Sequence, residues 1–367
     1  VEPCWHGHQV RGLAESENID GVEIRRFRYA SEAKQTLAYH GDMHKQVFSS
    51  PFKAYLFLKF LLKWRKATKL LIQDIQPDIV HAHWLIPGGY VTSKAMKKSK
   101  TPLFLSMHGT DVFLVRKRKL AQRMAKKIFR QSRNSHFVSK ALQESIAVSC
   151  QRKASSNDLI LPMFFDFKRF SEIGGKADTK KILFVGRLLS VKGVDVLLEA
   201  FSMFHSNENQ NHWTLDIVGD GPLSEDLQQL AEQKNISNNV TFHGSLERDA
   251  LTKVYGECDI FVLPSRTTST GEKEGLGVVL LEAMMAKVAV IGTNCGGIPE
   301  VIEHLETGLI VEQDNANSLF EAIQTLTEDA DLRKRLVDQA YEKTTEKYSN
   351  KSIQLQLRQW YGGRLNE

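Results

Sequence analysis

The chain of 367 residues has few cysteines and no apolar run long enough to cross a membrane. Its four cysteines, Cys4, Cys150, Cys258 and Cys295, stand apart without CxxC spacing. This argues against a disulfide framework or a zinc site and favours a reducing compartment. A bilayer-spanning helix needs about 18 consecutive apolar residues, and no signal-peptide pattern opens the chain. We therefore expect a cytoplasmic protein, soluble or peripheral on the cytoplasmic face of the membrane.

What the chain does have is an ordinary globular composition, with 42% hydrophobic and 25% charged residues, and a length that favours two domains. Its charge is divided unevenly. Residues 1–170 carry 30 Lys and Arg against 13 Asp and Glu, whereas residues 171–367 carry 19 against 30. The net charge of +6 thus joins a basic half to an acidic half, so an anionic partner is expected for the first half only.

Two segments concentrate the positive charge. Residues 51–72 have the spacing of an amphipathic helix, with lysines on one stripe among leucines and aromatics, which is typical of a helix on a membrane surface. A core-packed helix with a solvated lysine face explains the pattern equally well. Residues 116–133 carry nine basic and no acidic residues, which strengthens the prediction of an anionic lipid or acceptor surface. Because no nucleic-acid motif accompanies the charge, we expect no nucleic acid partner.

Short apolar strands alternate with helical segments along the second half. The strands are KILFVGR, WTLDIVGDGP, VTFHG, DIFVLPS, VAVIGT and GLIV, with helices at about 193–205, 223–234 and 248–255 and further ones at 318–339 and 353–361. This alternation predicts parallel βαβ units and hence an α/β fold. The apolar pattern gives way to a Gly/Lys/Asp stretch at residues 162–180, where we place the domain boundary.

The stretch 264–299 carries two carboxylates, Glu274 and Glu282, around the turn Gly275-Leu276-Gly277, after which Val278 opens a helix. A glycine turn at a helix start points N–H groups and the positive helix end at one spot, which suits a phosphate. The carboxylates suit hydroxyl groups. Glu282 stands among apolar residues, where an unpaired carboxylate is costly, so it needs a partner. The pattern predicts a nucleotide-sugar site.

Other turns add cations and a histidine. Gly186-Arg187 follows a strand and Lys192 opens the next helix, so their two positive groups are suited to a diphosphate, in the ground state and as it departs. Gly219-Asp220-Gly221 is a weaker signal, because such turns are common. His108, at a strand end before Gly109, either faces a cleft or only fixes its loop. His81 and His83 could share a metal, but lining a cleft is favoured.

Glu274, seven intervening residues and Glu282, followed by Ala283-Met284 and Gly296-Gly297-Ile298-Pro299-Glu300, resemble the retaining family 4 (group 1) glycosyltransferases over nearly the whole chain. The resemblance implies the GT-B fold, two Rossmann-like domains facing a central cleft. The acceptor-side domain is expected at 1–165, with a helix at about 351–361 packed back on it. The donor-binding domain is expected at 172–345.

The resemblance also implies roles. A sugar moves from a nucleoside-diphosphate sugar to a saccharide or lipid-linked acceptor, in cell-surface polysaccharide or glycolipid synthesis. No cofactor or metal is expected, and no DxD-type motif lies in a suitable loop. Catalytic roles fall on His108, Arg187, Lys192 and Glu274. Donor-binding roles fall on Gly186, Gly219, Asp220, Gly275, Leu276, Gly277, Val278 and Glu282, the last through the ribose, and Gly109 and Asp111 lie on the acceptor side. Since no separate nucleophile is evident, a front-face route is favoured, in which the leaving phosphate takes the acceptor's proton.

One departure concerns the start of the chain. Similar enzymes begin with a strand and a glycine-rich turn, whereas this sequence starts past that point at VEPCWHGHQV. We therefore expect the first domain to lack its leading strand, with truncation as the favoured explanation. The alternatives are a non-catalytic nucleotide-sugar-binding partner, a truncated inactive glycosyltransferase and, less favoured, an epimerase of the same fold.

Overall fold

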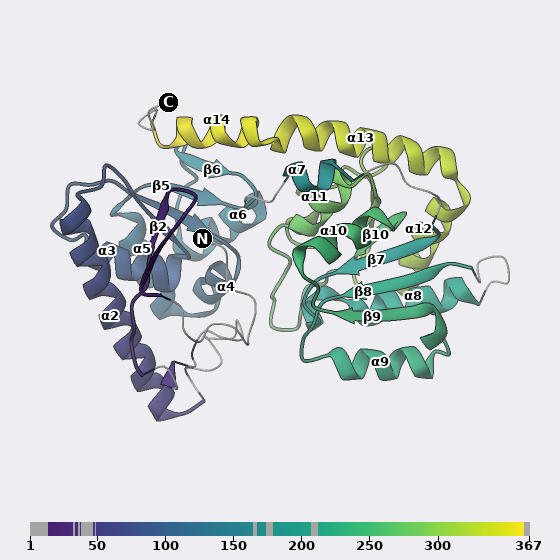
Figure 1. The fold of residues 1–367 in the computed structure, drawn as a ribbon, viewed down its shortest axis with the longest axis horizontal. Coiled ribbons are helices and arrows are strands. Elements are labelled where there is room, and N and C mark those ends of the chain that lie inside the picture. Colours follow the sequence, from purple (N-terminus) through teal and green to yellow (C-terminus); the bar gives the residue numbers. More distant parts are fainter. Residues whose placement is uncertain are drawn as a thin grey trace. The chain divides into compact units, whose positions relative to one another are not determined.

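The computed structural model describes residues 14–31, 34–35, 37, 47, 49–163, 167–173, 179–206 and 212–362. The chain forms two compact units, one of residues 1–107 and 117–135 and one of residues 108–116 and 136–367 (Figure 1). We expected the first domain to lack its leading strand, but residues 1–13 lie outside the described residues. Part of the predicted domain boundary at 162–180 also lies outside them. The predicted domain limits remain a prediction.

The second unit is built on a six-stranded parallel sheet with the order β12-β11-β10-β7-β8-β9. Most residues of the five strands other than β9 are buried, because helices cover both faces of such a sheet, and this is why these strands read as continuous apolar runs. Strand β9, at one edge of the sheet, is mostly half-buried. The six predicted strands are confirmed: β7 Lys181–Val185, β8 Thr214–Val218, β9 Val240–Gly244, β10 Ile260–Leu263, β11 Ala289–Thr293 and β12 Leu309–Val311.

The strand order reverses between β7 and β10. From β7 the chain adds β8 and β9 on one side, then returns to add β10, β11 and β12 on the other. The carboxyl ends of β7 and β10 are therefore neighbours at the switch point, which is where open α/β sheets bind their ligands. The segments that follow these two strands begin at Gly186 and Pro264.

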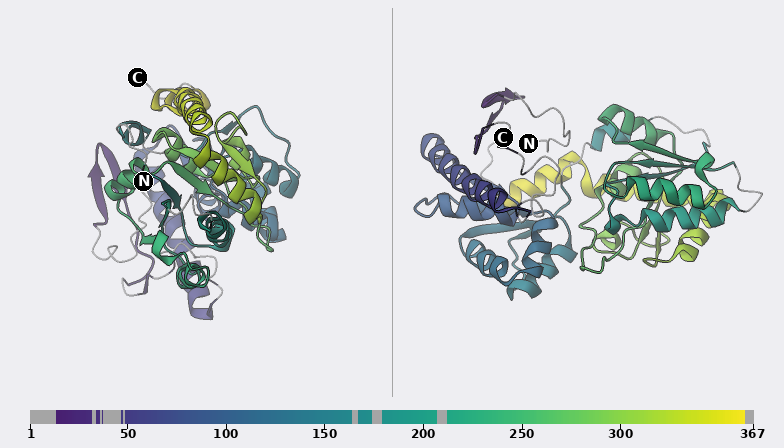
Figure 2. Two further views of the ribbon diagram at one scale, coloured as in Figure 1. Left: turned by 90° about the vertical axis from the view of Figure 1, so that its right-hand side faces the viewer. Right: turned by 90° about the horizontal axis from the view of Figure 1, so that it is seen from below.

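Two groups of helices cover this sheet. In one, α8 packs with α9 and α12, and in the other α11 packs with α7 and α13 (Figures 1 and 2). The helices are α7 Phe167–Ser171, α8 Val194–His205, α9 Ser224–Gln233, α10 Arg248–Gly256, α11 Val278–Met285, α12 Ala316–Glu328, α13 Ala330–Tyr348 and α14 Asn350–Trp360.

The helix predicted over 318–339 is in fact two helices. Between α12 and α13 stands Asp329, whose carboxylate accepts the N–H of Leu332 at 2.8 Å and so satisfies one of the first N–H groups of α13. Further on, α14 is fastened by Trp360, whose indole N–H donates to the carbonyl of Asn157 at 3.2 Å. The Trp360 ring also meets His136 edge-on, with 6.0 Å between ring centroids.

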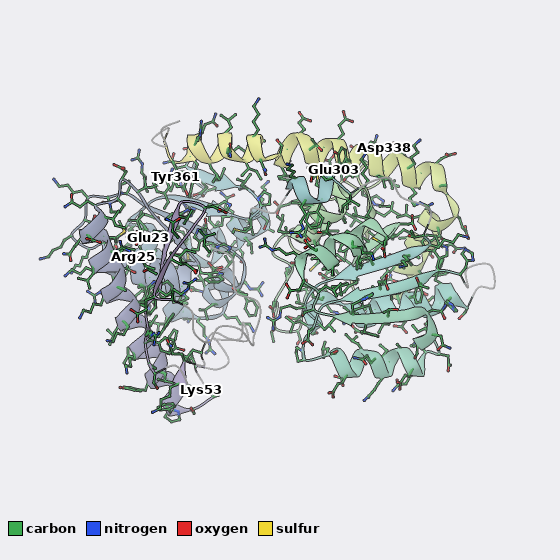
Figure 3. All side chains as sticks on the ribbon, viewed as in Figure 1. Glu23, Arg25, Lys53, Glu303, Asp338 and Tyr361 are labelled. Atoms are coloured by element: carbon green, nitrogen blue, oxygen red, sulfur yellow. The ribbon has the colours of Figure 1, made fainter. Side chains whose placement is uncertain are left out.

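The first unit begins with the hairpin of β1 Ser16–Ile19 and β2 Val22–Arg25, on which Figure 3 labels Glu23 and Arg25. Its turn residues Asp20 and Gly21 both have positive φ angles, as a tight hairpin turn requires. A further sheet, whose residues are divided between the two units, has the order β3-β4-β5-β6. Its strands and neighbouring helices are β3 Val80–His83, β4 Leu103–Met107, β5 Ser132–Phe137, β6 Asp158–Ile160, α3 Tyr90–Ala95, α4 Thr110–Lys117, α5 Lys119–Phe129 and α6 Lys140–Cys150.

The long helix α2, Pro51–Ile75, has two unlike faces. On one, Phe60 stacks on Phe27 with 5.6 Å between ring centroids, and it meets Trp64 of the same helix at a tilt, with 5.3 Å between centroids. The other exposes Phe52, Tyr55, Leu58, Leu62 and Leu70 together with Lys63, Lys66 and Lys69. Core packing thus accounts for one face only. Across the described residues, no helix combines the length and the apolar character that a membrane span requires.

Candidate functional site

The segment after β7 is held by close backbone contacts. Gly193 has a φ of 65°, and a Cβ atom there would lie 2.1 Å from the carbonyl oxygen of Pro264, so only glycine lets α8 start against the end of β10. Likewise, a Cβ atom at Gly219 would lie 1.9 Å from the carbonyl oxygen of Gly186. The Leu188 N–H donates to the carbonyl of Asp220 at 3.0 Å. The predicted residues Gly186, Gly219 and Asp220 are thereby brought together.

The two predicted charged residues at this point form an ion pair. The Nζ atom of Lys192 lies 2.6 Å from Oε2 of Glu274, with 19% and 12% of the side chains exposed. The same oxygen accepts the Ser265 hydroxyl at 3.0 Å, and Oε1 accepts the Gly275 N–H at 3.2 Å. Burial alone raises the pKa of Glu274, but the Lys192 charge and the hydrogen bonds from Lys192, Ser265 and Gly275 outweigh it, so the pKa lies below its ordinary value.

The backbone of Glu274 is fixed by the two glycines that follow β11. Gly296 has a φ of 57°, and a Cβ atom there would lie 1.9 Å from the Glu274 carbonyl oxygen. The N–H of Gly297 donates to that oxygen at 3.2 Å. The pair Gly296-Gly297 therefore serves to seat the loop that carries Glu274, which gives this part of the sequence motif a physical reason.

The turn after Glu274 opens α11. Gly277 has a φ of 85°, as glycine readily does at a helix start, and the side chain of Leu276 is buried in the core. Only the backbone of the turn is thus left to face a ligand. Ser139 donates its hydroxyl to the Gly275 carbonyl at 2.7 Å.

Glu300 contacts the start of α6. Its carboxylate accepts the N–H groups of Lys140 and Ala141 at 2.6 and 2.7 Å, two of the unpaired donors of that helix terminus. No role was predicted for Ser139 or Glu300 from the sequence. A serine between a strand and a helix is a helix-start signal that could have identified Ser139.

Glu282, on α11, has a protein partner that was not predicted. The hydroxyl of Tyr255 donates to its Oε2 at 2.9 Å. Burial raises the pKa of Glu282, and the Tyr255 hydrogen bond only partly offsets this. Burial and the neighbouring Glu282 raise the pKa of the fully buried Tyr255 well above its ordinary value. In this structure the Glu282 carboxylate is thus paired with Tyr255 on α10, and the contact of Glu282 with a ribose remains a prediction.

The loop of His108 and Gly109 faces the same turn. A Cβ atom at Gly275 would lie 3.4 Å from the His108 carbonyl oxygen, and one at Gly109 would lie 3.9 Å from Gly275 Cα. The buried carboxylate of Asp111 accepts the N–H groups of His108 and Gly109 at 3.1 and 3.0 Å. In this structure Asp111 therefore positions the loop backbone. The roles of His108, Gly109 and Asp111 toward a substrate stay predictions.

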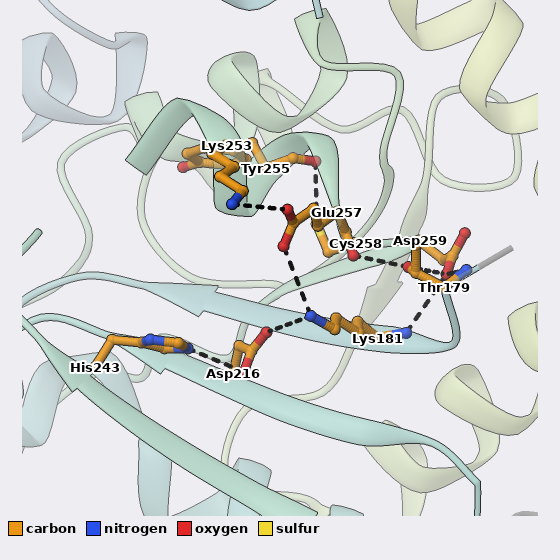
Figure 4. A network of polar contacts seen from close by, with 9 residues as sticks. All are labelled: Thr179, Lys181, Asp216, His243, Lys253, Tyr255, Glu257, Cys258 and Asp259. Atoms are coloured by element: carbon orange, nitrogen blue, oxygen red, sulfur yellow. Dashed lines mark hydrogen bonds and ion pairs between the residues drawn. The ribbon is translucent and has the colours of Figure 1, made fainter. Parts of the chain in front are cut away.

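A separate polar network joins β7, β8 and β9 (Figure 4). Asp216 lies 3.0 Å from His243 and 3.8 Å from Lys181, which in turn lies 3.7 Å from Glu257. These contacts tie neighbouring strands to the end of α10. Within the described part of the chain, no group of three or more His, Cys, Asp and Glu residues is arranged to hold a metal ion. His81 and His83 lie side by side, with 4.4 Å between ring centroids.

Two family models match the sequence and together cover most of it. Residues 7–154 match the family described as Glycosyltransferase Family 4, and residues 166–343 match Glycosyl transferases group 1. A sequence relative is the N-acetyl-alpha-D-glucosaminyl L-malate synthase of Bacillus anthracis, 27% identical over 75% of this chain and 72% of that protein.

Solved structures show the same fold at low sequence identity. Sucrose-phosphate synthase from Thermosynechococcus elongatus aligns with a TM-score of 0.75 and 20% identity, over 96% of this chain and 86% of that one. HepE from Anabaena, in complex with UDP, aligns with a TM-score of 0.66 and 18% identity, over 82% and 80% of the two chains. Both are GT-B structures, and the chain has their fold of two Rossmann-like α/β domains.

The lowered pKa of Glu274 makes its contribution to stability depend on pH. A carboxyl whose pKa is depressed on folding stabilises the fold above its ordinary pKa, and this is lost as the pH falls through the folded value. We expect Glu274→Gln to lower the free energy of unfolding at pH 7 by about 1–3 kcal/mol, with the gap to wild type closing below pH 4.5. Urea unfolding across this range measures it, and Glu272→Gln on the same loop is the control. A gap that does not change with pH would contradict the assignment.

Tyr255→Phe removes the hydroxyl that meets Glu282 and leaves a buried carboxylate short of a donor. We expect a loss of about 1.5–3 kcal/mol in the free energy of unfolding, measured by urea unfolding. The loss should shrink in a Glu282→Gln background, because the charge is then gone. Tyr341→Phe, which keeps the ring over which Lys287 lies, is the control. Equal losses in both backgrounds would show that the contact carries no coupling energy.

Proposed function

The chain belongs to the family 4 (group 1) glycosyltransferases, and we propose that it transfers a sugar from a nucleoside-diphosphate sugar to a saccharide or lipid-linked acceptor with retention at the anomeric carbon. The process we propose is the synthesis of cell-surface polysaccharide or glycolipid. Neither a metal nor a cofactor takes part in this proposal.

The observation that carries the proposal is the position of the Lys192–Glu274 pair. The lysine follows β7 and the glutamate follows β10, the two strands between which the sheet order reverses. A cation for a diphosphate and a carboxylate for sugar hydroxyls thus lie together at the point where such sheets take their ligands. Arg187 stands on the same segment as Lys192. A sugar nucleotide is the ligand class that needs both kinds of group.

The chemistry follows from these charges. As the bond between the anomeric carbon and the phosphate oxygen breaks, negative charge grows on the departing diphosphate, and Arg187 and Lys192 stabilise it. In the front-face route the leaving phosphate oxygen accepts the proton of the attacking hydroxyl. Glu274 holds the sugar's hydroxyls, Glu282 those of the ribose, and His108 organises the sugar. The UDP bound by HepE supports a nucleoside diphosphate as the common part of the donor.

The decisive test is donor consumption. UDP-sugars and GDP-sugars are incubated with the protein, release of the nucleoside diphosphate is followed, and the anomer of the product is read by NMR. Arg187→Ala should lower kcat by about 10²–10³-fold, because a cation that stabilises the charge growing on the departing diphosphate is lost. Arg335→Ala on α13 is the control and should leave kcat unchanged. Unchanged turnover in Arg187→Ala would contradict the role of Arg187 on the departing diphosphate. Binding of a donor without turnover in the wild type would favour the non-catalytic alternative.

We also propose that the exposed face of α2 docks on an anionic membrane, which would hold the protein where a lipid-linked acceptor lies. The support is that five large apolar side chains and three lysines share this exposed face, the composition of a helix at a lipid surface. The basic run 116–133 adds positive charge in the same half of the chain. The anion met there is proposed to be lipid headgroup phosphate.

Flotation with vesicles tests the docking. Wild type should float with vesicles that contain phosphatidylglycerol and less with phosphatidylcholine alone. Changing Lys63, Lys66 and Lys69 to Glu should abolish binding, because each lysine contributes about 1 kcal/mol near an anionic surface. The matched control changes Lys168, Lys334 and Lys351 to Glu. Flotation that is indifferent to anionic lipid, or equal in the two triple variants, would count against α2 as the docking face.

A further inference from the structure

The Lys192–Glu274 pair joins two groups that the proposed reaction needs on different parts of its donor. In the proposed reaction Lys192 binds the diphosphate and Glu274 binds the sugar. In this structure the two side chains instead form an ion pair, with 2.6 Å between Lys192 Nζ and Glu274 Oε2. Because the carboxylate offsets the charge of the ammonium, the pair as a whole attracts a phosphate only weakly. A diphosphate that binds Lys192 therefore competes with Glu274 for the ammonium.

We propose that Glu274 makes the site prefer a loaded sugar nucleotide over a spent nucleoside diphosphate, by competing with the diphosphate for Lys192. This rests on the function proposed above. When a sugar is present, its hydroxyls satisfy the Glu274 carboxylate and Lys192 is released to the diphosphate. Once the sugar has been transferred, Glu274 takes Lys192 back and weakens the hold on the product.

The contacts around the pair say which partner moves. The Glu274 carboxylate accepts hydrogen bonds from the Ser265 hydroxyl and the Gly275 N–H besides Lys192. Its backbone carbonyl accepts the N–H of Gly297. Lys192 has a flexible stem whose Cε atom would lie 3.7 Å from a Cβ atom at Gly186, so its stem runs beside the turn proposed for the diphosphate. A lysine is a mobile point charge with rotatable donors. The ammonium is thus the part that changes partner, while the carboxylate stays in place.

Removing Glu274 should change the affinities of the two ligands in opposite directions. Without Glu274, the nucleoside diphosphate no longer competes for Lys192 and binds more tightly, whereas the sugar nucleotide loses a hydroxyl contact and binds more weakly. A residue that merely contacts the donor would weaken the sugar nucleotide and leave the diphosphate unchanged. The ratio of the two dissociation constants is therefore the quantity to measure.

The experiment uses the full chain with UDP and UDP-glucose, and in parallel GDP and GDP-mannose, by isothermal titration calorimetry. Glu274→Gln should lower the Kd of the diphosphate by about three- to tenfold, the range expected for a partly exposed ion pair, and raise that of the sugar nucleotide. Glu272→Gln, which removes the same charge from the same loop, should change neither Kd. Glu274→Asp keeps the charge but shortens the reach to Lys192, so it should also tighten diphosphate binding.

A second background separates competition from simple repulsion. With Lys192→Met the effect of Glu274→Gln on diphosphate binding should vanish, because there is no ammonium to compete for. If the gain persists undiminished there, or if neither Glu274 variant tightens the diphosphate, the inference is wrong while the proposed function stands. If the wild type binds no nucleotide in either series, both fall. If Lys192→Met does not fold, the diphosphate Kd of Glu274→Asp compared with that of Glu272→Gln still tests the inference.

Discussion

The contact on which the site depends is the approach of the β7 segment to the β10 segment without side chains between them. Gly193 meets the Pro264 carbonyl where any Cβ atom would collide, and Gly296 meets the Glu274 carbonyl in the same way. These contacts set the two segments close enough for Lys192 and Glu274 to pair. Ser265, the Gly275 N–H and Gly297 then keep the carboxylate in one place. The electrostatics of the site thus follow from backbone packing.

Much of this could be predicted from the sequence, since buried parallel strands give continuous apolar runs and glycine turns mark strand ends. The six strands of the second unit were predicted in this way, as were the turns on which Lys192 and Glu274 stand, while the roles of the two residues toward a substrate remain predictions. That these two residues pair could not be predicted, because they stand 82 positions apart and meet only through the order in which the strands lie. The same is true of Tyr255, which reaches Glu282 from a different helix.

One local error and one alternative left open have equally physical causes. The helix predicted across 318–339 continues its apolar spacing through Asp329, so the periodicity hid a cap that the carboxylate forms with Leu332. For α2 the core-packed and membrane-surface interpretations were both left open, and the structure has one packed face and one exposed face. Phe60 and Trp64 pack among aromatic neighbours, whereas Leu58 and Leu62 stay exposed beside the lysines. One-dimensional spacing cannot say which of two apolar stripes is covered.

The glycine contacts also bear on how such a site could change through evolution or design. Because the two segments are aligned by backbone against backbone, their alignment does not depend on which side chains they present. Side chains of the 267–271 segment, which take no part in these glycine contacts, could be exchanged while the frame stays intact. The glycines themselves have no such freedom. The scaffold is therefore rigid where the chain touches itself and open to variation where it would touch its substrate.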